Sequence, residues 1–357
     1  MRPSTTTLRA FRAGALHRLV VAVFCSLLLS GCAGVQSALD PAGPQAGHIN
    51  GLWWLMFYTL SAVFLIVMCL LLVAAFRRRR PLSGDRTDEP DTKPDPGRER
   101  RMSHAVMGGV GITVIILFVL LVSSFLTGRS LYSIASSGEG VIVIEVTGHQ
   151  WWWDVKYSND TPSLIVTTAN EIHLPVGRPA LIKLTSNDVI HSFWIPNLHG
   201  KIDLIPGHVT NTWIRADRPG TYRGQCAEFC GHQHAHMAFT VIVESAEQFQ
   251  TWYEAQLRPA AQPSTPGQTR GQQVFLSSPC IMCHRIQGTD AGGRVGPDLT
   301  HVASRPTLAA GTLENTRGHL AGWVVDSQKI KPGNRMPPNN LEPQDLQALL
   351  DYLQSLK

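Results

Sequence analysis

Two long stretches of the chain carry no charged side chain, and they limit its possible folds more than any other feature. Leu52–Phe76 contains 25 residues and Ala105–Thr127 contains 23. A helix rises about 1.5 Å per residue, so each stretch can cross the roughly 30 Å hydrocarbon core of a bilayer. The sequence therefore predicts a hairpin of two transmembrane helices over residues 50–128.

Basic residues indicate how this hairpin is oriented. Nine of the 31 lysine and arginine residues lie between Arg77 and Arg101. Because loops retained in the cytoplasm are enriched in lysine and arginine, the loop 77–104 is predicted to be cytoplasmic and the chain after Thr127 to be exported. Aromatic residues cluster at the opposite end of the first stretch, as an interfacial belt would: Trp53, Trp54 and Tyr58.

Composition excludes several classes of function. The net charge of +5 comes largely from that one basic segment, so a face that binds nucleic acid is not expected. No glycine-rich phosphate loop lies between a predicted strand and helix, which argues against a nucleotide enzyme. Hydrophobic residues make up 44% of the 357 residues and charged residues 16%, a balance that argues against disorder.

The first 31 residues resemble a bacterial secretory signal of the lipoprotein type. The uncharged run Leu19–Leu29 follows a basic start and is too short to span a bilayer. It leads into Leu-Ser-Gly-Cys, which ends at Cys32 and resembles the lipoprotein box. This resemblance implies cleavage before Cys32 and attachment of a lipid to it. An uncleaved leader with an ordinary cysteine is the alternative.

The seven cysteines indicate cofactor binding rather than a disulfide framework. Three of them lie in or beside the apolar N-terminal segments: Cys25, Cys32 and Cys69. Cys25 falls in the predicted signal, and Cys69 is interpreted as a packing residue within the first span. The other four form two close pairs with histidine nearby: Cys226 with Cys230, and Cys280 with Cys283. Such short spacings are typical of metal or haem sites.

Between residues 140 and 257 the pattern changes to short strands. Three runs are rich in β-branched residues: Val141–Val146, Ser163–Thr168 and Pro179–Thr185. Turn signals such as Pro219-Gly220 separate such runs, and Ala246–Leu257 is predicted to be a helix that closes the domain. The spacing predicts an antiparallel β-sandwich.

The segment Cys226–Met237 carries the chemistry of this domain. It combines two thiols, imidazoles and a thioether within twelve residues, and this ligand set suits copper or zinc. A single-copper electron-transfer site needs one cysteine, two histidines and a weak axial methionine. A second thiolate four residues from the first can instead bridge two copper ions. A structural zinc site is the alternative, although it gives Met237 no role, and a segment that binds no metal is the third possibility.

One imidazole ligand has to come from another strand, because a sandwich brings distant segments together. The best candidate is His191, which lies at a strand edge. Its competitors are more typical of surface or packing residues: His149, His173, His199 and His208. Within the segment itself, composition alone does not separate His234 from its neighbours His232 and His236.

These motifs resemble subunit II of cytochrome c oxidase. The resemblance rests on Cys-x-Glu-x-Cys-x₃-His-x₂-Met from Cys226, on His191-Ser-aromatic and on the Gly148–Trp153 segment, and it covers Asn50–Gln256. It implies a cupredoxin domain with a dinuclear copper A centre. The resemblance implies the following ligands: bridging Cys226 and Cys230, one histidine for each copper (His191 and His234), Met237, and the backbone carbonyl of Glu228.

The same resemblance assigns two further roles. It implies that the Glu228 side chain contributes to a magnesium site shared with subunit I. It also makes Trp151 the aromatic residue through which electrons enter, whereas the residues alone indicate only core and turn aromatics at Trp151–Trp153. One feature departs from the family. Many members carry Glu-Trp at the cytoplasmic start of the second helix, and here the segment Arg98–Val106 offers only Glu99 or His104 as a substitute.

The last 90 residues, 268–357, contain a second cofactor motif. They follow a proline-rich linker, 258–267, which is predicted to be extended. Cys280-x-x-Cys283-His284 is the c-type haem attachment pattern: both thiols can form thioethers, and the histidine faces the iron. A redox or zinc Cys-x-x-Cys is the alternative. Helices are expected at Leu320–Gln328 and Gln344–Leu356.

A sixth haem ligand should be histidine or methionine. Met336 is the strongest candidate, because it lies in a rigid proline-rich loop between the two predicted helices. The runners-up are His301 and His319, and Met282 is interpreted as a packing residue. Gly296–Leu299, Met336 and the final helix resemble class I cytochrome c. A methionine ligand raises the haem potential, which suits an electron donor to copper.

Together these features predict a multidomain membrane protein with a two-helix transmembrane hairpin, an all-β cupredoxin sandwich and an all-α cytochrome c domain. The expected function is that of the oxidase subunit at which electrons enter, in a bacterial inner membrane. Electrons pass from an external donor such as a cytochrome c through haem c and copper A to subunit I, where oxygen is reduced. Subunits I and III are the expected partners.

Two other classes share some of these motifs. A copper-delivery lipoprotein would bind copper without turnover, but it has no use for an attached haem domain. A relative of nitrous oxide reductase would use a similar copper loop. The paired transmembrane stretches and the lack of a large second metal domain argue against it.

Overall fold

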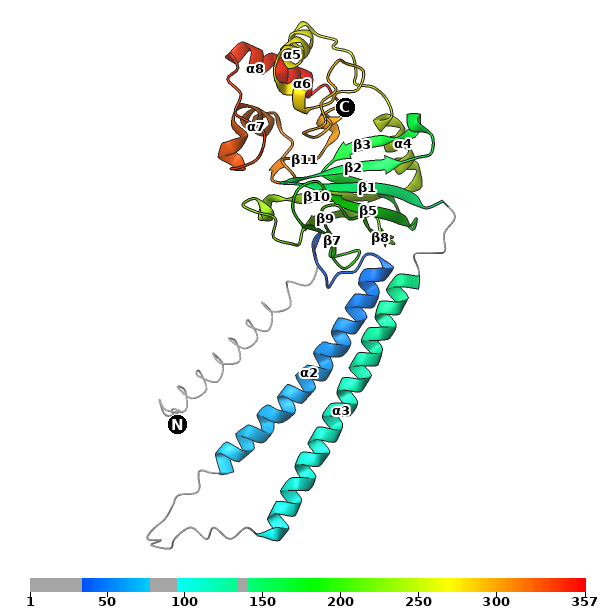
Figure 1. Ribbon diagram of the computed structural model, residues 1–357, viewed down its shortest axis with the longest axis vertical. Helices are drawn as coiled ribbons and strands as arrows, with labels where there is room; N and C mark the ends of the chain where they lie inside the picture. Colours follow the sequence, from blue (N-terminus) through cyan, green and yellow to red (C-terminus); the bar gives the residue numbers. More distant parts are fainter. Residues whose placement is uncertain (1–33, 78–94, 134–139) are drawn as a thin grey trace, which may run out of the picture. The chain divides into compact units, whose positions relative to one another are not determined.

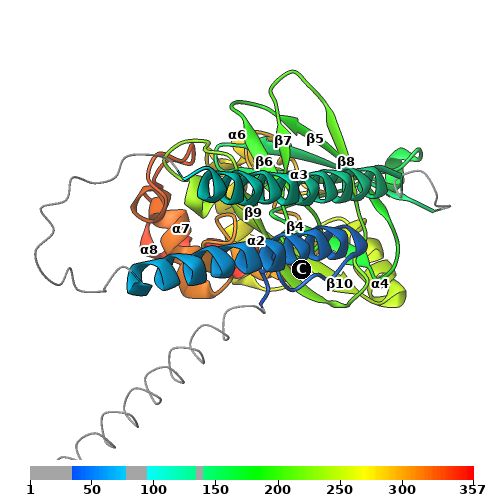
Figure 2. The ribbon, with the colours of Figure 1, turned by 90° about the horizontal axis from the view of Figure 1, so that it is seen from below.

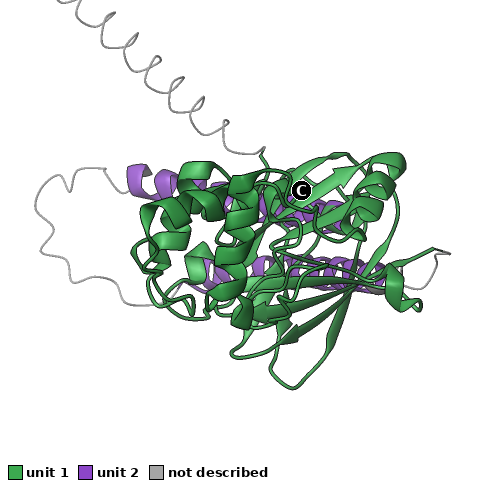
Figure 3. Cartoon of the chain, turned by 90° about the horizontal axis from the view of Figure 1, so that it is seen from above, with its two compact units in different colours: residues 1–46, 138–357 green, residues 47–137 purple. Residues whose placement is uncertain are grey.

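The computed structural model describes residues 34–77, 95–133 and 140–357. These residues belong to two units (Figure 3): residues 34–46 with 140–357 form the first, and the described part of 47–137 forms the second. The predicted signal peptide, Cys32 and most of the predicted cytoplasmic loop lie outside the described residues.

The second unit consists of two long apolar helices. Helix α2 spans Pro44–Arg77 and helix α3 spans Pro96–Ser133, and each is continuous along its length (Figures 1 and 2). Each contains an 18-residue window with a mean hydropathy of 2.8. The predicted pair of helices is therefore confirmed. Both helices extend past the uncharged stretches, because polar residues such as Arg98 continue the helical backbone beyond the apolar run.

After α3 the chain forms two five-stranded sheets, which with helix α4 form the β-domain (residues 142–256). The first sheet has the order β3-β2-β1-β5-β8 and the second the order β4-β10-β9-β6-β7. The strands of the first sheet are β1 (Ile142–His149), β2 (Trp152–Ser158), β3 (Val166–Ala169), β5 (Ala180–Ser186) and β8 (Thr210–Ile214). Those of the second are β4 (Glu171–Pro175), β6 (His191–Trp194), β7 (Ile202–Leu204), β9 (Gly220–Cys226) and β10 (Ala238–Glu244).

The predicted sandwich is present, but the prediction of purely antiparallel strands is wrong. Strand β1 pairs with β5 in parallel, and β4 pairs with β10 in parallel. The chain leaves the first sheet after β3, forms β4 in the second sheet and returns as β5. Such a crossover allows parallel pairing, which a two-residue hairpin does not. The predicted strand at 163–168 starts only at Val166, because a 3₁₀ turn occupies Pro162–Leu164.

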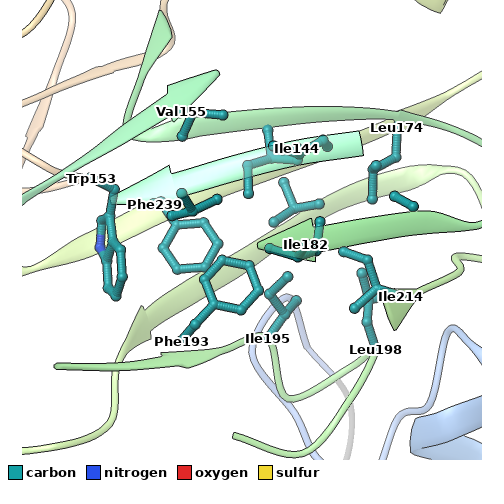
Figure 4. Close-up of a cluster of buried hydrophobic side chains, with 14 of the residues drawn as sticks. Ile144, Trp153, Val155, Leu174, Ile182, Phe193, Ile195, Leu198, Ile214 and Phe239 are labelled. Atoms are coloured by element: carbon teal, nitrogen blue, oxygen red, sulfur yellow. The ribbon is translucent and has the colours of Figure 1, made fainter. Parts of the chain in front are cut away.

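The core of the β-domain follows the alternation of its strands. Every second residue of β5 is buried, and the inward side chains meet those of the second sheet (Figure 4). The rings of Trp153 and Phe239 pack 5.3 Å apart at the end of the core. Helix α4 (Ala246–Gln256) starts with a capping box formed by Ser245 and Gln248 and buries Phe249 in this core. Burial of such a side chain stabilises the fold by about 2 kcal/mol.

Residues 34–46, which lead into α2 and include its first three residues, also pack on the β-domain. Ala42 is buried, and its N–H donates to the carbonyl of Asn197 at 2.7 Å. The side-chain amide of Asn197 donates to the carbonyls of Gly34 and Asp40 at 3.0 and 2.9 Å. Arg218 forms an ion pair with Asp40 at 2.7 Å. Residues 34–46 are therefore fixed to a domain that the chain completes only after both helices.

Residues 266–357 form the helical domain. Its helices are α5 (Pro266–Ser277), α6 (Cys280–Cys283), α7 (Arg317–Ile330) and α8 (Pro343–Leu353), and a two-stranded ribbon joins β11 (Thr307–Leu308) to β12 (Leu313–Glu314). Helices α5 and α8 cross closely at Gly271, where a Cβ would lie 2.0 Å from the carbonyl oxygen of Ala348. The predicted linker is not free along its length, because Ala260 is buried against this domain and donates to the carbonyl of Gln287.

Candidate functional site

The segment after β9 folds back so that its sulfur atoms meet. Cys226 ends β9, and the segment returns to the sheet at β10. The Sγ atoms of Cys226 and Cys230 lie 3.7 Å apart, and Cys230 Sγ lies 3.8 Å from Met237 Sδ. All three side chains are buried and belong to the β-domain core. The local spacing of the segment is therefore enough to collect three sulfur ligands at one point.

Two imidazoles reach the same point from different elements. His191 starts β6, and its Nδ1 lies 3.8 Å from Cys226 Sγ. His234 comes from the segment itself, and its Nδ1 lies 3.6 Å from Cys230 Sγ. The carbonyl oxygen of Glu228 lies 3.2 Å from Cys226 Sγ. All the groups that the sequence suggested as copper ligands thus converge.

The orientation of His191 is fixed by a carboxylate that sequence reasoning missed. The Nε2 of His191 donates to Asp188 Oδ1 at 2.8 Å, which leaves Nδ1 facing the sulfur atoms. Asp188 Oδ2 accepts the backbone N–H of Gln150 at 2.7 Å. A carboxylate that fixes the tautomer of a metal-binding histidine is a common second layer of metal sites. Its position three residues before His191 was the available signal.

The electrostatics of the two thiols favour a bound cation. The hydrogen bond from Cys230, with those of His191 and two backbone groups, lowers the pKa of Cys226 and favours its thiolate. That thiolate and burial raise the pKa of Cys230. A second thiolate here therefore needs positive charge, which a metal supplies. The residues present fit a copper centre bridged by two thiolates.

The competing histidines lie elsewhere. His149 stacks on Trp152, and His173 stacks on Trp252 and bonds Glu244 at 2.8 Å. His236 Nδ1 bonds the side chain of Gln233 at 2.8 Å rather than facing the sulfur atoms. Within the described residues, the compact group of ligand atoms is that of His191, Cys226 and Cys230, all within 4.8 Å of one another.

The haem motif borders a cavity of about 270 Å³. Cys280, Cys283 and His284 lie on its wall, and so does Met336. The Nδ1 of His284 donates to the carbonyl of Pro297 at 2.7 Å, so its Nε2 is left for a metal. The loop around Met336 is held in place because the Met336 carbonyl accepts hydrogen bonds from Ser327 Oγ and Gln328 Nε2.

The alternative haem ligands do not line this cavity. His301 is buried and bonds the carbonyl of Arg258 at 3.1 Å, and His319 bonds the carbonyl of Glu314 at 2.8 Å. Met282, interpreted as a packing residue, lines the cavity. Arg305 is a further lining residue, and its buried Nε has no hydrogen-bond partner. A buried guanidinium with a free donor suits an acidic group such as a haem propionate.

Trp151 lies between the two sites. Its Nε1 donates to the carbonyl of Cys230 at 2.9 Å, and its ring lines the cavity of the helical domain. Gly231 allows this contact: its φ is +112°, and a Cβ there would lie 3.1 Å from the indole. The sequence pattern alone placed Trp151 in a turn or core, and only the resemblance singled it out.

The comparisons with known proteins agree with both sites. Residues 159–246 match the family model "Cytochrome C oxidase subunit II, periplasmic domain", and residues 268–357 match that of cytochrome c. Cytochrome c oxidase subunit 2 of Alkalihalophilus pseudofirmus is 35% identical over 342 residues, which cover 94% of this chain and 95% of the relative. The subunit 2 of Bacillus subtilis is 27% identical over 344 residues, which cover 93% and 95%.

These matches identify the two domains and their sites. The β-domain is cupredoxin-like and periplasmic, and α2 and α3 anchor it in the membrane. His191, Cys226, Cys230 and Met237 form its copper A site, and the helical domain is a cytochrome c domain for haem. A match over nearly the whole length also removes the copper-delivery and reductase alternatives. The chain belongs to the cytochrome c oxidase subunit II family and transfers electrons through copper A and its fused cytochrome c domain in a haem-copper terminal oxidase.

Proposed function

We propose that this subunit accepts electrons from an external cytochrome at its helical domain and that Trp151 conducts them to the copper loop on the way to subunit I. The observation that carries this proposal is the double contact of Trp151. Its Nε1 is bonded to the carbonyl of the ligand Cys230, and its ring lines the same cavity as His284 and Met336. A single side chain thus touches both sites.

In the helical domain, Cys280 and Cys283 would hold haem c covalently, and His284 and Met336 would bind its iron. The bond of His284 to Pro297 orients the imidazole, and the buried Arg305 neutralises an acidic substituent of the group. When bound, haem c and copper A supply the one-electron couples of the pathway. The protein's own task is to hold these groups near each other and away from water.

In the β-domain, His234 and the backbone carbonyl of Glu228 complete the copper ligands. Their contacts with Cys230 Sγ at 3.6 Å and with Cys226 Sγ at 3.2 Å support this role. The side chain of Glu228 is exposed, which leaves its carboxylate available for a magnesium ion shared with subunit I.

The remaining assignments concern the membrane and the complex. Cys32 carries a lipid, the loop 77–104 is cytoplasmic, and subunit III joins subunit I as a partner. Glu99 and His104 both lie exposed on α3, and one of them substitutes for the usual acidic residue of a proton path. The functional division of the chain is as follows: signal peptide 1–31, transmembrane hairpin 50–128, copper domain 140–257, linker 258–267 and cytochrome c domain 268–357.

Replacement of the bridging indole tests the pathway. Trp151→Phe removes the bond to the Cys230 carbonyl and shortens the conjugated ring. Electron transfer from haem c to copper A, followed after flash reduction of haem c in the intact oxidase, should slow about tenfold or more, the effect of about 1.4 kcal/mol on a barrier. Copper and haem content and their absorption spectra should stay as in the wild type.

The matched control is Trp152→Phe. Trp152 is the next indole in the chain and stacks on His149 rather than bonding the copper loop. It should change the rate little. A Trp151→Phe enzyme that transfers electrons at the wild-type rate with full copper would contradict the proposed route.

A further inference from the structure

Lys331 is an unusual residue of the helical domain, because its charged end is buried against the β-domain. Its side chain is 2% exposed. The Nζ atom donates to the carbonyls of Trp151 and His236 at 2.7 Å each and to that of Ala309 at 3.0 Å. Two of these acceptors belong to the β-domain and one to the helical domain. The ammonium therefore joins the two domains at a single atom.

The chemistry of this contact is well matched. An ammonium has three N–H donors and no acceptor, and here it meets three carbonyl oxygens. All three acceptors are backbone carbonyls, so their positions do not depend on the conformations of neighbouring side chains. A buried charge is tolerated only where such partners surround it. If the domains separated, the ammonium and the two carbonyls of the β-domain would lose these hydrogen bonds and would bond to water instead.

The residues beside Lys331 extend the contact. The side-chain amide of Gln233 donates to the carbonyl of Pro332 at 2.8 Å, and the N–H of Ala238 donates to the carbonyl of Ala310 at 3.0 Å. Gly333 lies against the indole of Trp151, where a Cβ would be 3.6 Å from the ring. We call the contacts of Lys331, Pro332 and Ala310 with the β-domain the joint. The short loop 331–336 begins at the joint and ends at Met336 on the cavity wall.

We propose that Lys331 is a positioning residue for electron transfer: its ammonium fixes the loop that carries Met336 onto the backbone of Trp151 and of the copper loop. The proposal rests on the route through Trp151 proposed above. In that route the loop 331–336 sets the distance between the haem cavity and the copper loop. A loop that is held less firmly would let this distance increase. Lys331 lines the haem cavity, but its hydrogen bonds go to backbone carbonyls, so it acts through Trp151 and the joint.

The test uses the intact oxidase with Lys331→Met, which keeps the length of the side chain and removes its charge and donors. Lys329→Met is the matched control, because the Lys329 side chain is 85% exposed. Hydrogen exchange reads the joint directly: the amide of Ala238 is protected only while Ala310 accepts its hydrogen bond. Flash reduction of haem c reads the internal transfer rate, and redox titration reads the haem potential.

In Lys331→Met, exchange at Ala238 should become about tenfold faster, since a net loss near that of one hydrogen bond changes an equilibrium by this factor. Exchange in strands β1 and β5 should not change. Internal electron transfer should slow by a similar factor, and by more than the change in haem potential accounts for, because Lys331 lines the haem cavity and its charge acts on that potential. The sulfur–iron absorption should stay as in the wild type. Lys329→Met should match the wild type in every measurement.

Unchanged exchange at Ala238 in Lys331→Met would overturn the proposal. Faster exchange with an unchanged transfer rate would also overturn it, because the joint would then not govern the path. If Trp151→Phe slows transfer and Lys331→Met does not, the route through Trp151 stands and this proposal fails. Should Lys331→Met lose its haem or copper, Lys331→Gln, with two donors for three carbonyls, is judged by the same criteria.

Discussion

The copper loop and the haem cavity, although joined by one tryptophan, are built in opposite ways. Cys226, Cys230 and Met237 are members of the hydrophobic core of the β-domain, and their sulfur atoms already lie within 4 Å of a neighbour. His284 and Met336 are instead half-buried walls of a 270 Å³ cavity. The protein itself therefore assembles the first site. In the helical domain, the haem would itself fill space between the core residues.

This contrast predicts different dependences on the cofactor. Sheet hydrogen bonds and a continuous core hold the copper ligands whether or not metal is bound. In the helical domain half of the core residues line the cavity, so removal of the haem leaves a void beside them. Loss of the haem should therefore destabilise the helical domain far more than loss of copper destabilises the β-domain.

The strongest test of the contrast removes haem attachment. Cys280→Ser combined with Cys283→Ser should abolish covalent haem, and the helical domain should lose its fold while the β-domain keeps both its fold and its copper. Limited proteolysis with mass mapping would show cleavage confined to residues after Gln256. A helical domain that stays resistant to protease without haem would remove the basis of the comparison.

The reciprocal change affects copper alone. Cys226→Ser should eliminate the dinuclear copper, because bridging needs both thiolates, while haem c stays attached and the helical domain stays folded. Metal analysis and near-infrared absorption measure the loss. His232→Ala and His236→Ala serve as controls and should keep copper near the wild-type level. Retention of dinuclear copper in Cys226→Ser would refute the ligand assignment.

A milder change sharpens the description of the haem wall. Met336→Leu should leave haem covalently attached, since Cys280, Cys283 and His284 remain, but the axial sulfur is lost. The haem potential should fall, because a methionine ligand favours reduced iron. Oxygen consumption driven by an external cytochrome should then decrease, whereas a small reductant that reaches copper A directly should still support it. An unchanged potential would point to another ligand.

The smallest effect concerns the junction of the two domains. Burial, and then the charge of Asp298 in the helical domain, raise the pKa of Asp154 on β2 to about 6. Because the folded protein binds this proton more tightly than the unfolded chain, stability should fall as pH rises from about 4 to 6. Asp154→Asn should flatten this part of the profile and stabilise the protein at pH 7 by about 2 kcal/mol, or about 5 °C in Tm. Thermal unfolding between pH 4 and 7 measures it, and equal slopes for both proteins would contradict it.

The sequence predicted the parts of the molecule that depend on local spacing. The two apolar stretches predicted α2 and α3, and the spacing from Cys226 to Met237 predicted that two thiols, an imidazole and a thioether would meet, because a short segment between paired strands brings its own residues together. The choice of His234 over His232 and His236 came from the resemblance. His191 was found because a strand edge offers an imidazole to a neighbouring loop. These predictions used only nearby residues and the alternation of strands.

Contacts between distant segments were not predictable in this way. The parallel pairing of β1 with β5 depends on the chain's path between two sheets, which no local pattern records. Nothing near Lys331 in the sequence indicates that its ammonium meets the carbonyl of Trp151, 180 residues earlier. Asp188 accepts the backbone N–H of Gln150, 38 residues earlier, and no local pattern indicates this contact. The missed residues share one property: their partners lie on elements that pack only in the finished fold.

The segment 34–46 has a consequence for the order of biogenesis. It is partly buried in the β-domain, yet the whole membrane hairpin separates it from the strands it contacts, and the Asn197 amide reaches back 163 residues to Gly34. Closing so long a loop in free solution is slow, because contacts of high sequence separation carry a large entropic cost. Insertion of α2 and α3 brings both ends of the loop to the same side of the bilayer. The membrane thus acts as a template for this domain, and a chain whose hairpin is delayed in insertion would export a sandwich that still lacks one of its buried segments.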